Sequence, residues 1–258
     1  MLRAMVGRTR YQPVFERLHR FALQGMNIGG GTNVRSSGES VVIERILPGL
    51  VGDDHATVFD VGANVGSYST EILNAFGSRV ELHAFEPSTA AFAQLSARIG
   101  GQANVHLHEI GLGARADRVT LYANVDGSGL GSVYHRRLDH IGITMDVTEE
   151  IVVRPLDDVC VEEGIDRISL LKMDVEGHEL QVLEGARGML DRKAIDLIQF
   201  EFGGCNIDSR TYFQDFFYLL DPDFRLHRIV RDGLTPVDRY READEIFITT
   251  NFLAIRRR

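Results

Sequence analysis

Residues 58–69 read VFDVGANVGSYS and give the strongest local signal in the chain. An apolar run, which predicts a buried strand, leads into a turn of small residues, and a helix is expected to begin at Ser67 or Tyr68. Glycine lets a turn take positive φ or approach a ligand closely, and the free N–H groups of a helix N-terminus favour an anionic group. The stretch therefore predicts a turn that binds a cofactor carrying a phosphate or a carboxylate.

The spacing of the glycines separates two cofactor classes. Dinucleotide-binding folds have glycines at relative positions 1, 3 and 6, whereas this turn has Gly62, Asn64 and Gly66 at positions 1, 3 and 5 and Asp60 inside the strand end. The pattern argues against a nicotinamide nucleotide. It resembles the first motif of Rossmann-like methyltransferases, with asparagine in place of the middle glycine.

A second expected strand ends in an acid, Glu86, followed by Pro87. A carboxylate at this place can accept hydrogen bonds from both hydroxyls of a ribose. A surface acid at a strand end is the alternative, and the nearby glycine turn favours the ribose. Ile110 and Gly111 follow the third expected strand, where an adenine would lie, but an ordinary glycine turn explains them equally well.

Short apolar runs alternate with helical stretches through most of the chain. This alternation predicts an α/β fold with a mostly parallel sheet and helices on both faces. Five strands are expected at residues 57–61, 79–85, 105–110, 169–174 and 197–202, with helices at 68–76, 88–99 and 179–191. Two further strands at 225–230 and 246–254 make seven, and 118–122 with 151–155 predict a strand insertion around a Gly/Ser-rich stretch.

Residues 1–50 are expected to form an N-terminal helical cap on a Rossmann-like domain at residues 51–258. A helix over residues 11–24 carries Val14, Leu18 and Phe21 on one face, and that face is expected to pack on the main domain. A Gly-, Asn- and Ser-rich loop at 25–38 and a second helix at 39–50 are expected to follow.

Composition excludes several classes of protein. The net charge of −9, from 37 acidic and 28 basic residues, argues against a protein whose main function is to bind the phosphate backbone of nucleic acid. No apolar run is long enough to cross a bilayer, and the first residues lack the apolar core of a signal peptide, so we expect a cytoplasmic protein without membrane insertion. Cys160 and Cys205 are too few for a disulfide framework or a cysteine metal cluster. The composition is compatible with a monomer and with a homo-oligomer.

Residues 170–179, LLKMDVEGHE, hold the densest set of ionisable groups. They follow an expected strand, and open α/β sheets bind ligands at the carboxyl ends of their strands. His178 has an intrinsic pKa suited to a general base, although a helix-start residue with a local hydrogen bond is the alternative. Lys172 is expected to pair with an acid such as Glu201. Asp174 and Glu201 could bind a divalent metal, but paired carboxylates are common without an ion, and no metal is favoured.

The strings DVGANVGSYS, AFEP, LLKMDVEGHELQVLEGA and IQFEF resemble the FkbM family of methyltransferases over roughly residues 57–202. The resemblance implies a Rossmann-like class I methyltransferase fold with a seven-stranded sheet and S-adenosylmethionine as the cofactor. It also implies methyl transfer, usually to a hydroxyl oxygen of a sugar or other natural product.

The resemblance assigns roles by position in the motifs. The implied cofactor contacts are Asp60, Gly62, Ala63, Asn64, Gly66, Glu86, Pro87, Ile110, Gly111 and Asp174. The implied catalytic candidates are Asp174, Glu176 and His178. The candidates for contact with a small-molecule or glycan acceptor are Glu201, Asn206, Asp208 and Arg210.

Two other functions stay open at this point. An NAD-type oxidoreductase would use a similar sheet, but the glycine spacing speaks against it. A non-catalytic module that kept the cofactor pocket is opposed by the intact acids Asp60, Glu86 and Asp174 and by His178.

Overall fold

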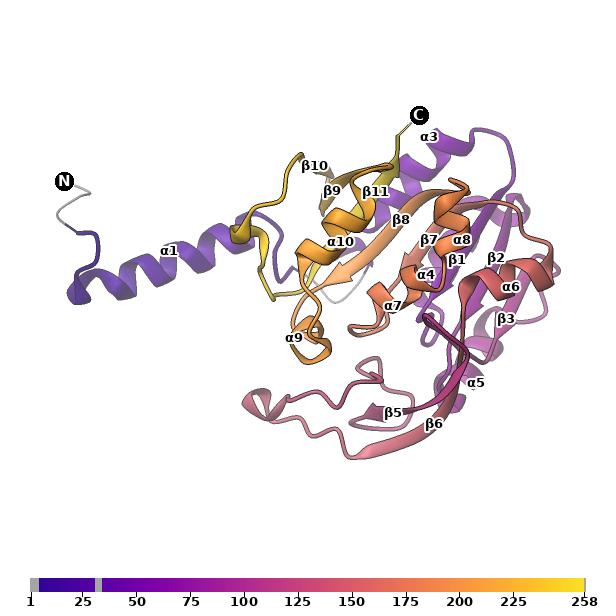
Figure 1. Cartoon of the computed structure of the whole chain (residues 1–258), viewed down its shortest axis with the longest axis horizontal. Coiled ribbons are helices and arrows are strands. Elements are labelled where there is room, and N and C mark those ends of the chain that lie inside the picture. Colours follow the sequence, from indigo (N-terminus) through magenta and orange to yellow (C-terminus); the bar gives the residue numbers. More distant parts are fainter. Residues whose placement is uncertain (1–4, 31–33, 258) are drawn as a thin grey trace.

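The computed structural model describes residues 5–30 and 34–257, and its centre is a sheet of eight strands (Figure 1). The strands lie in the order β10-β9-β11-β8-β7-β1-β2-β3. Their bounds are β1 Ala56–Val61, β2 Val80–Phe85, β3 Val105–His108, β7 Ile168–Met173, β8 Ile195–Phe202, β9 Phe224–Val230, β10 Gly233–Val237 and β11 Thr250–Arg256.

The sheet confirms the predicted fold class. Strands β3, β2, β1, β7 and β8 are parallel, and β11 runs antiparallel between β8 and β9. All seven predicted strands are present. The eighth, β10, forms an antiparallel hairpin with β9 at the edge and contains Pro236, a residue that sheets tolerate at edges.

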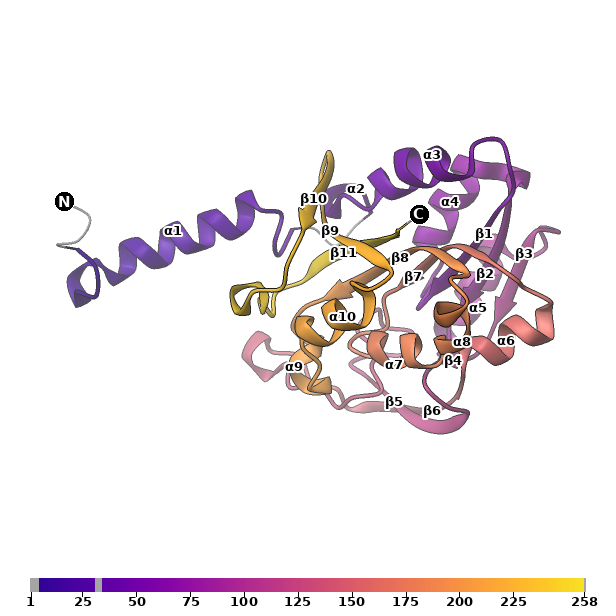
Figure 2. The same cartoon turned by 45° about the horizontal axis from the view of Figure 1, so that its top comes forward.

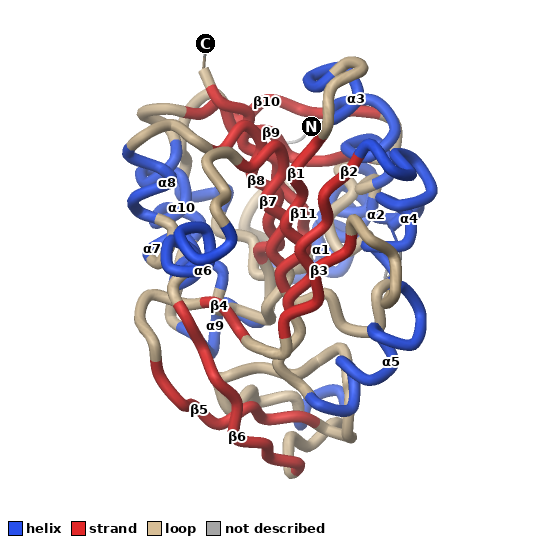
Figure 3. The backbone as a smooth tube through the Cα atoms, turned by 90° about the vertical axis from the view of Figure 1, so that its right-hand side faces the viewer, coloured by secondary structure: helices blue, strands red, loops and turns tan. Residues whose placement is uncertain are grey.

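Helices cover both faces of this sheet, as Figure 3 shows along its edge. One face carries α6 Leu156–Glu163, α7 Glu179–Glu184, α8 Arg187–Asp191 and α10 Phe213–Leu220, and the other carries α4 Ser67–Phe76 and α5 Thr89–Ile99. The predicted helix at 179–191 is split into α7 and α8. A Cβ on Gly185 would lie 2.0 Å from the carbonyl oxygen of Gly113, so the backbones meet here and only glycine fits.

Each face of the sheet has its own apolar layer. On one side Phe59, Phe85 and Phe200 pack with α10 and the helices beside it. On the other side Leu82 and Leu170 pack with α4 and α5. The strands are buried on both faces because helices cover both, which is why they could be recognised as continuous apolar runs.

The predicted strand insertion forms a separate three-stranded sheet. Its order is β4-β6-β5, with β4 Gly111–Leu112, β5 Asp117–Ala123 and β6 Val147–Arg154. Strands β5 and β6 pair antiparallel along their whole length. Figures 1 and 3 show this small sheet beside the end of the main sheet where the parallel strands have their carboxyl ends.

Helix α1, Gln12–Gly25, is present as predicted, but its predicted packing is wrong. Figures 1 and 2 show it extending away from the body of the molecule. Leu23 is its only buried residue, and Val14, Leu18 and Phe21 are 46%, 56% and 74% exposed. The segment after α1 is held by the body, since the Gly29 N–H donates to the carbonyl oxygen of Thr249, and α1 leads outward from that anchor.

The rest of the N-terminal region packs on the main sheet. A π-helical turn at Val42–Ile46 continues into α3, Leu47–Val51, which confirms the second predicted helix, and its apolar side chains join the layer of α4 and α5. The expected loop contains the short helix α2, Val34–Ser37, while residues 31–33 of that loop lie outside the described residues. The division at residue 50 stays a prediction. No helix in the described part of the chain combines the length and apolarity needed to cross a membrane.

Candidate active site

The turn after β1 is held between two neighbouring strands. Gly62 takes a φ of 76°, and a Cβ there would lie 1.9 Å from the carbonyl oxygen of Asp174, so no other residue fits. The N–H groups of Gly62 and Ala63 donate to the carbonyl oxygen of Phe85 at 3.0 and 2.9 Å. These contacts bring the turn against the ends of β2 and β7. Gly66, with φ 80°, is the N-cap of α4.

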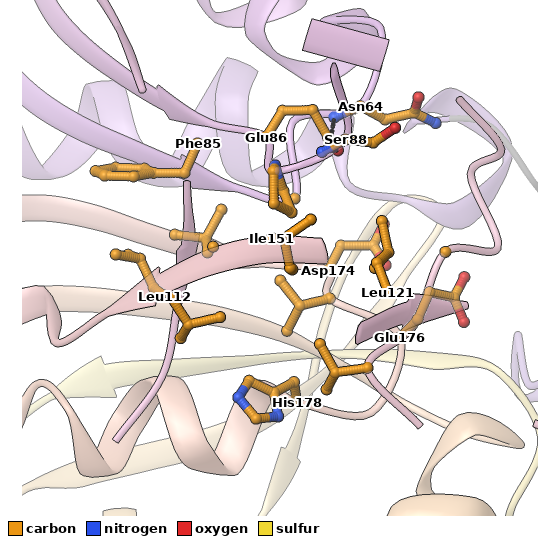
Figure 4. Close-up of a pocket in the computed structure, with 18 of the residues that line it drawn as sticks. Asn64, Phe85, Glu86, Ser88, Leu112, Leu121, Ile151, Asp174, Glu176 and His178 are labelled. Carbon is orange, nitrogen blue, oxygen red and sulfur yellow. Dashed lines mark hydrogen bonds between the residues drawn. The ribbon is translucent and has the colours of Figure 1, made fainter. Parts of the chain in front are cut away.

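Glu86 lies beside this turn, at the end of β2. Its Oε2 accepts the Asn64 N–H at 2.8 Å and its Oε1 accepts the Ser88 N–H at 2.9 Å (Figure 4). Burial raises the pKa of Glu86, and the two backbone N–H groups partly offset the rise. Each carboxylate oxygen is thus fixed in place and keeps acceptor capacity for a ligand hydroxyl.

An apolar hollow opens next to Glu86, and the insertion sheet supplies one of its walls. Pro87 and Gly111 line it, as do Asp174, Glu176 and His178. The apolar side chains around it are Phe85, Leu112, Leu121, Ile151 and Val153 (Figure 4). The sequence interpretation missed these walls. Ile110 packs against the core instead of lining the hollow.

A polar hollow lies on the other side of the turn. Glu39, Tyr68 and Lys172 line it, together with Ala63 and the first residues of α4. The polar and apolar hollows share Gly62, Asn64 and Asp174. The Oδ1 atom of Asn64 is buried and has no hydrogen-bond partner in the described part of the chain, so a donor on a ligand could satisfy it.

Beneath the polar hollow lies a buried ion pair. Lys172 Nζ is 2.9 Å from Asp60 Oδ1 and 3.9 Å from Asp174 Oδ2, and Ser69 Oγ donates to Asp60 Oδ2 at 2.7 Å. The predicted pairing of Lys172 with an acid is confirmed, but the suggested partner Glu201 is wrong, because Asp60 is the residue directly opposite Lys172 on the neighbouring strand. Burial alone would lower the pKa of Lys172, but the nearby carboxylates raise it above its ordinary value. Asp60 lines neither hollow.

A chain of hydrogen-bonded polar side chains lies beside the polar hollow and links it to the N-terminal region. Gln199 Nε2 donates to Glu39 Oε1 at 2.7 Å, and the Tyr68 hydroxyl donates to Gln199 Oε1 at 3.0 Å. Ser37 Oγ donates to the other oxygen of Glu39 at 2.7 Å. Burial raises the pKa of Glu39, and Lys172 and Ser37 partly offset the rise. These residues lie far apart in the sequence, and only the polar Gln199 inside an apolar strand could have indicated them.

The structure brings the three catalytic candidates to one end of the sheet but gives each a different setting. The Asp174 side chain is 44% exposed and lines both hollows. Glu176 is contacted by the guanidinium of Arg136, and the carbonyl oxygen of Glu176 accepts the Ser132 hydroxyl at 2.7 Å. Burial and Asp174 raise the pKa of Glu176, and Arg136 partly offsets the rise.

His178 lies at the far side of the apolar hollow from Asn64 and Glu86 (Figure 4). Its Nδ1 is 3.1 Å from the Tyr134 hydroxyl oxygen. Its Nε2 lies close to Gly113, so a larger side chain at position 113 would collide with the imidazole. Burial lowers the pKa of His178 to about 4, so the ring is neutral at neutral pH. Tyr134 thus holds the imidazole on its Nδ1 side.

The four acceptor candidates do not form one cluster. Glu201 is 3.5 Å from Thr249 Oγ1, and burial and Asp174 raise its pKa well above the ordinary value. Asn206 is fully buried and binds the Gly203 N–H, which makes it part of a turn around α9, Cys205–Ser209. Asp208 and Arg210 line a third hollow together with Asn206, so three of the four candidates share one hollow and Glu201 lies apart from it. In the part of the chain that the structure describes, no third ligating side chain joins Asp174 and Glu201.

Comparisons with known proteins bear on the chemistry of this site. A family model described as the methyltransferase FkbM domain matches residues 60–226. The 2-O-methyltransferase NoeI of Sinorhizobium fredii is 26% identical over 62% of this chain and 69% of that protein. The 31-O-demethyl-FK506 methyltransferase FkbM of Streptomyces tacrolimicus is 32% identical over 50% of this chain and 58% of that protein. The antimetabolite synthetase AmbE of Pseudomonas aeruginosa is 33% identical over 53% of this chain, but only 8% of AmbE is covered.

Proposed function

Because this chain belongs to the FkbM methyltransferase family and is an S-adenosylmethionine-dependent methyltransferase, we propose that it methylates a hydroxyl oxygen of a sugar, a glycan or another natural product. Two of the similar proteins carry names that refer to methyl groups on oxygen, which supports an oxygen acceptor. Family membership speaks against an NAD-type oxidoreductase, and the named methyltransferases among the similar proteins support an active enzyme.

The single observation that carries this proposal is the pair of hollows joined at Gly62, Asn64 and Asp174. The apolar hollow suits an adenine, and the fixed carboxylate of Glu86 suits two ribose hydroxyls. The polar hollow offers the start of α4 to a carboxylate and the carboxylate of Glu39 to an ammonium group. When bound there, S-adenosylmethionine supplies a methyl group that is already activated on a sulfonium.

Asp174 is the ionisable group at the junction of the two hollows, and we assign it the role of the base that accepts the proton of the acceptor hydroxyl. A hydroxyl must lose its proton as it attacks, and a carboxylate within hydrogen-bond reach can accept it. Holding the hydroxyl in line with the methyl carbon can lower the barrier by up to ~7–11 kcal/mol. His178 and Glu176 shape the wall of the apolar hollow in this proposal. A general base at His178 and a divalent metal between Asp174 and Glu201 are the alternatives.

The proposed oxygen specificity can be tested with methyl-labelled S-adenosylmethionine and a panel of sugars, glycans and polyketide-like alcohols. We expect label in compounds with free hydroxyl groups and an O-methyl signal in the NMR spectrum of the product. Matched compounds whose hydroxyl groups are blocked serve as the control. Label carried only by nitrogen or carbon would contradict the proposal.

Replacing Glu86 with alanine is expected to weaken binding of S-adenosylhomocysteine by about 10–100-fold. The carboxylate would no longer accept hydrogen bonds from a ribose, and a hydrogen bond to a charged group contributes about 1.5–3 kcal/mol. Calorimetric titration measures the affinity, and Glu109→Ala, an exposed acid just after β3, is the matched control. An unchanged affinity in a folded Glu86→Ala protein would remove the ribose assignment.

A further inference from the structure

A group of histidines lies on one face of the main sheet, and none of them lines either hollow. Glu81 and His83 are two residues apart on β2, and His106 and His108 are two residues apart on β3. Because side chains two residues apart on a strand point to the same side, all four side chains lie on one face of the sheet. His83 and His106 are directly opposite each other in the register. Their rings are stacked, with centroids 4.5 Å apart.

Three of these side chains bring ligand atoms together. One nitrogen each of His83 and His106 and one carboxylate oxygen of Glu81 all lie within 4.8 Å of one another, the only such trio among residues 5–30 and 34–257. Glu81 already contacts His106 Nε2. Ligand atoms in a tetrahedral zinc site lie about 3.3 Å apart, given bonds of about 2.0–2.2 Å. Small rotations of Glu81 and His106, which are 44% and 36% exposed, would close the set around an ion.

The surroundings of His83 are those that a metal-binding histidine needs. The residue is only 3% exposed, and its Nδ1 lies 3.3 Å from His108 Nε2. Histidines that bind metals with one nitrogen use the other for such a hydrogen bond, which fixes the orientation of the ring.

A surface hollow gives access to this group. It is lined by Glu81, His83 and His106, by Glu163 at the end of α6, and by the segment that follows, which includes Asp166. Glu163 and Asp166 add negative charge to the opening, and Arg167 adds a positive charge. With three protein ligands, a water molecule would occupy the fourth position of a tetrahedral site.

We propose that Glu81, His83 and His106 bind a Zn²⁺ ion that fastens the edge strand β3 to β2, with His108 orienting His83. Imidazole and carboxylate ligands in this combination suit zinc. Strand β3 is the last strand on its side of the sheet and is only four residues long. A metal bridge would add a strong link at a place where the ladder of hydrogen bonds is short.

The test is a calorimetric titration of untagged, EDTA-treated protein with zinc chloride, together with thermal unfolding. We expect one saturable site per chain and a higher melting temperature with zinc, because a ligand that binds only the folded state stabilises it. His106→Ala is expected to weaken zinc binding by at least 100-fold, and His108→Ala, which removes only the orienting residue, by about 10–100-fold. His140→Ala, an exposed histidine on another segment, is the matched control and should bind as the unchanged protein does.

Absence of saturable zinc binding overturns the proposal, as does equal binding by His106→Ala and the unchanged protein. Glu81→Gln supplies a second variant at an exposed position, so misfolding of one variant does not decide the result. Binding of S-adenosylhomocysteine is measured on the same samples and is expected to stay unchanged in the variants. The proposed zinc site and the proposed methyltransferase function are therefore tested independently of each other.

Discussion

Lys172→Met is expected to lower the free energy of unfolding by about 3–5 kcal/mol, because it leaves the carboxylate of Asp60 buried without its counter-ion. Asp60 is fully buried, and Ser69 would remain as its hydrogen-bond partner. Methionine has nearly the length of lysine, so the change removes the charge and leaves little empty space. Urea unfolding at neutral pH, followed by circular dichroism, measures the effect.

Two further variants separate the charge from the packing. Lys193→Met breaks an exposed pair with Asp223 and should cost only about 0–1 kcal/mol. The double variant Asp60→Asn/Lys172→Met removes both charges of this pair, so it should be more stable than Lys172→Met alone. A loss below about 1 kcal/mol in Lys172→Met would show that Asp60 does not depend on this pair.

Asp174→Asn is expected to reduce kcat by about two to four powers of ten, the range typical of losing a general base. The amide keeps the size of the side chain at the junction of the two hollows but cannot accept the proton of an attacking hydroxyl. Affinity for S-adenosylhomocysteine should change much less than kcat, because the backbone turn and Glu86 still hold the cofactor. Steady-state kinetics with a saturating acceptor measure the change, and Asp191→Asn on the surface of α8 is the matched control.

His178→Ala tells the two assignments of the base apart. Because His178 borders the apolar hollow and is held by Tyr134, we expect weaker cofactor binding and a smaller effect on kcat than in Asp174→Asn. A full loss of kcat in His178→Ala with normal kcat in Asp174→Asn would return the base to His178.

The pKa of His178 is depressed to about 4 in the folded protein. As the pH falls from about 6.5 toward 4, the unfolded chain therefore binds a proton at this histidine and the folded chain does not. The contribution of His178 to stability is therefore lost over that interval.

Much of the fold could be predicted because its strands carry strong local signals. Each of the seven predicted strands is an apolar run that helices cover or that ends in a recognisable turn. Strand β10 lacks this signal, since Gly233 and Pro236 are typical of turns and the strand pairs on one side only. The direction of α1 could not be predicted either. An amphipathic stripe indicates that a helix has an apolar face, but the stripe does not determine what covers it.

The candidate site was predictable where function depends on neighbours in sequence. Gly62 and Glu86 follow directly after strands, so their residue types and positions were informative. The pairing of Lys172 with Asp60 depends on the register of two strands more than 100 residues apart, which no local pattern reveals. Leu121 and Ile151 reach the apolar hollow only because the insertion sheet folds over it.

The hairpin of β9 and β10 also affects how the molecule meets its own copies in a concentrated solution. A free sheet edge can template the addition of a strand from another molecule, which is a common start of aggregation. Proline interrupts the row of backbone donors in such an edge, and Pro236 lies within β10, the outermost strand on this side. The same residue that hid β10 from recognition thus helps to keep the sheet from growing between molecules.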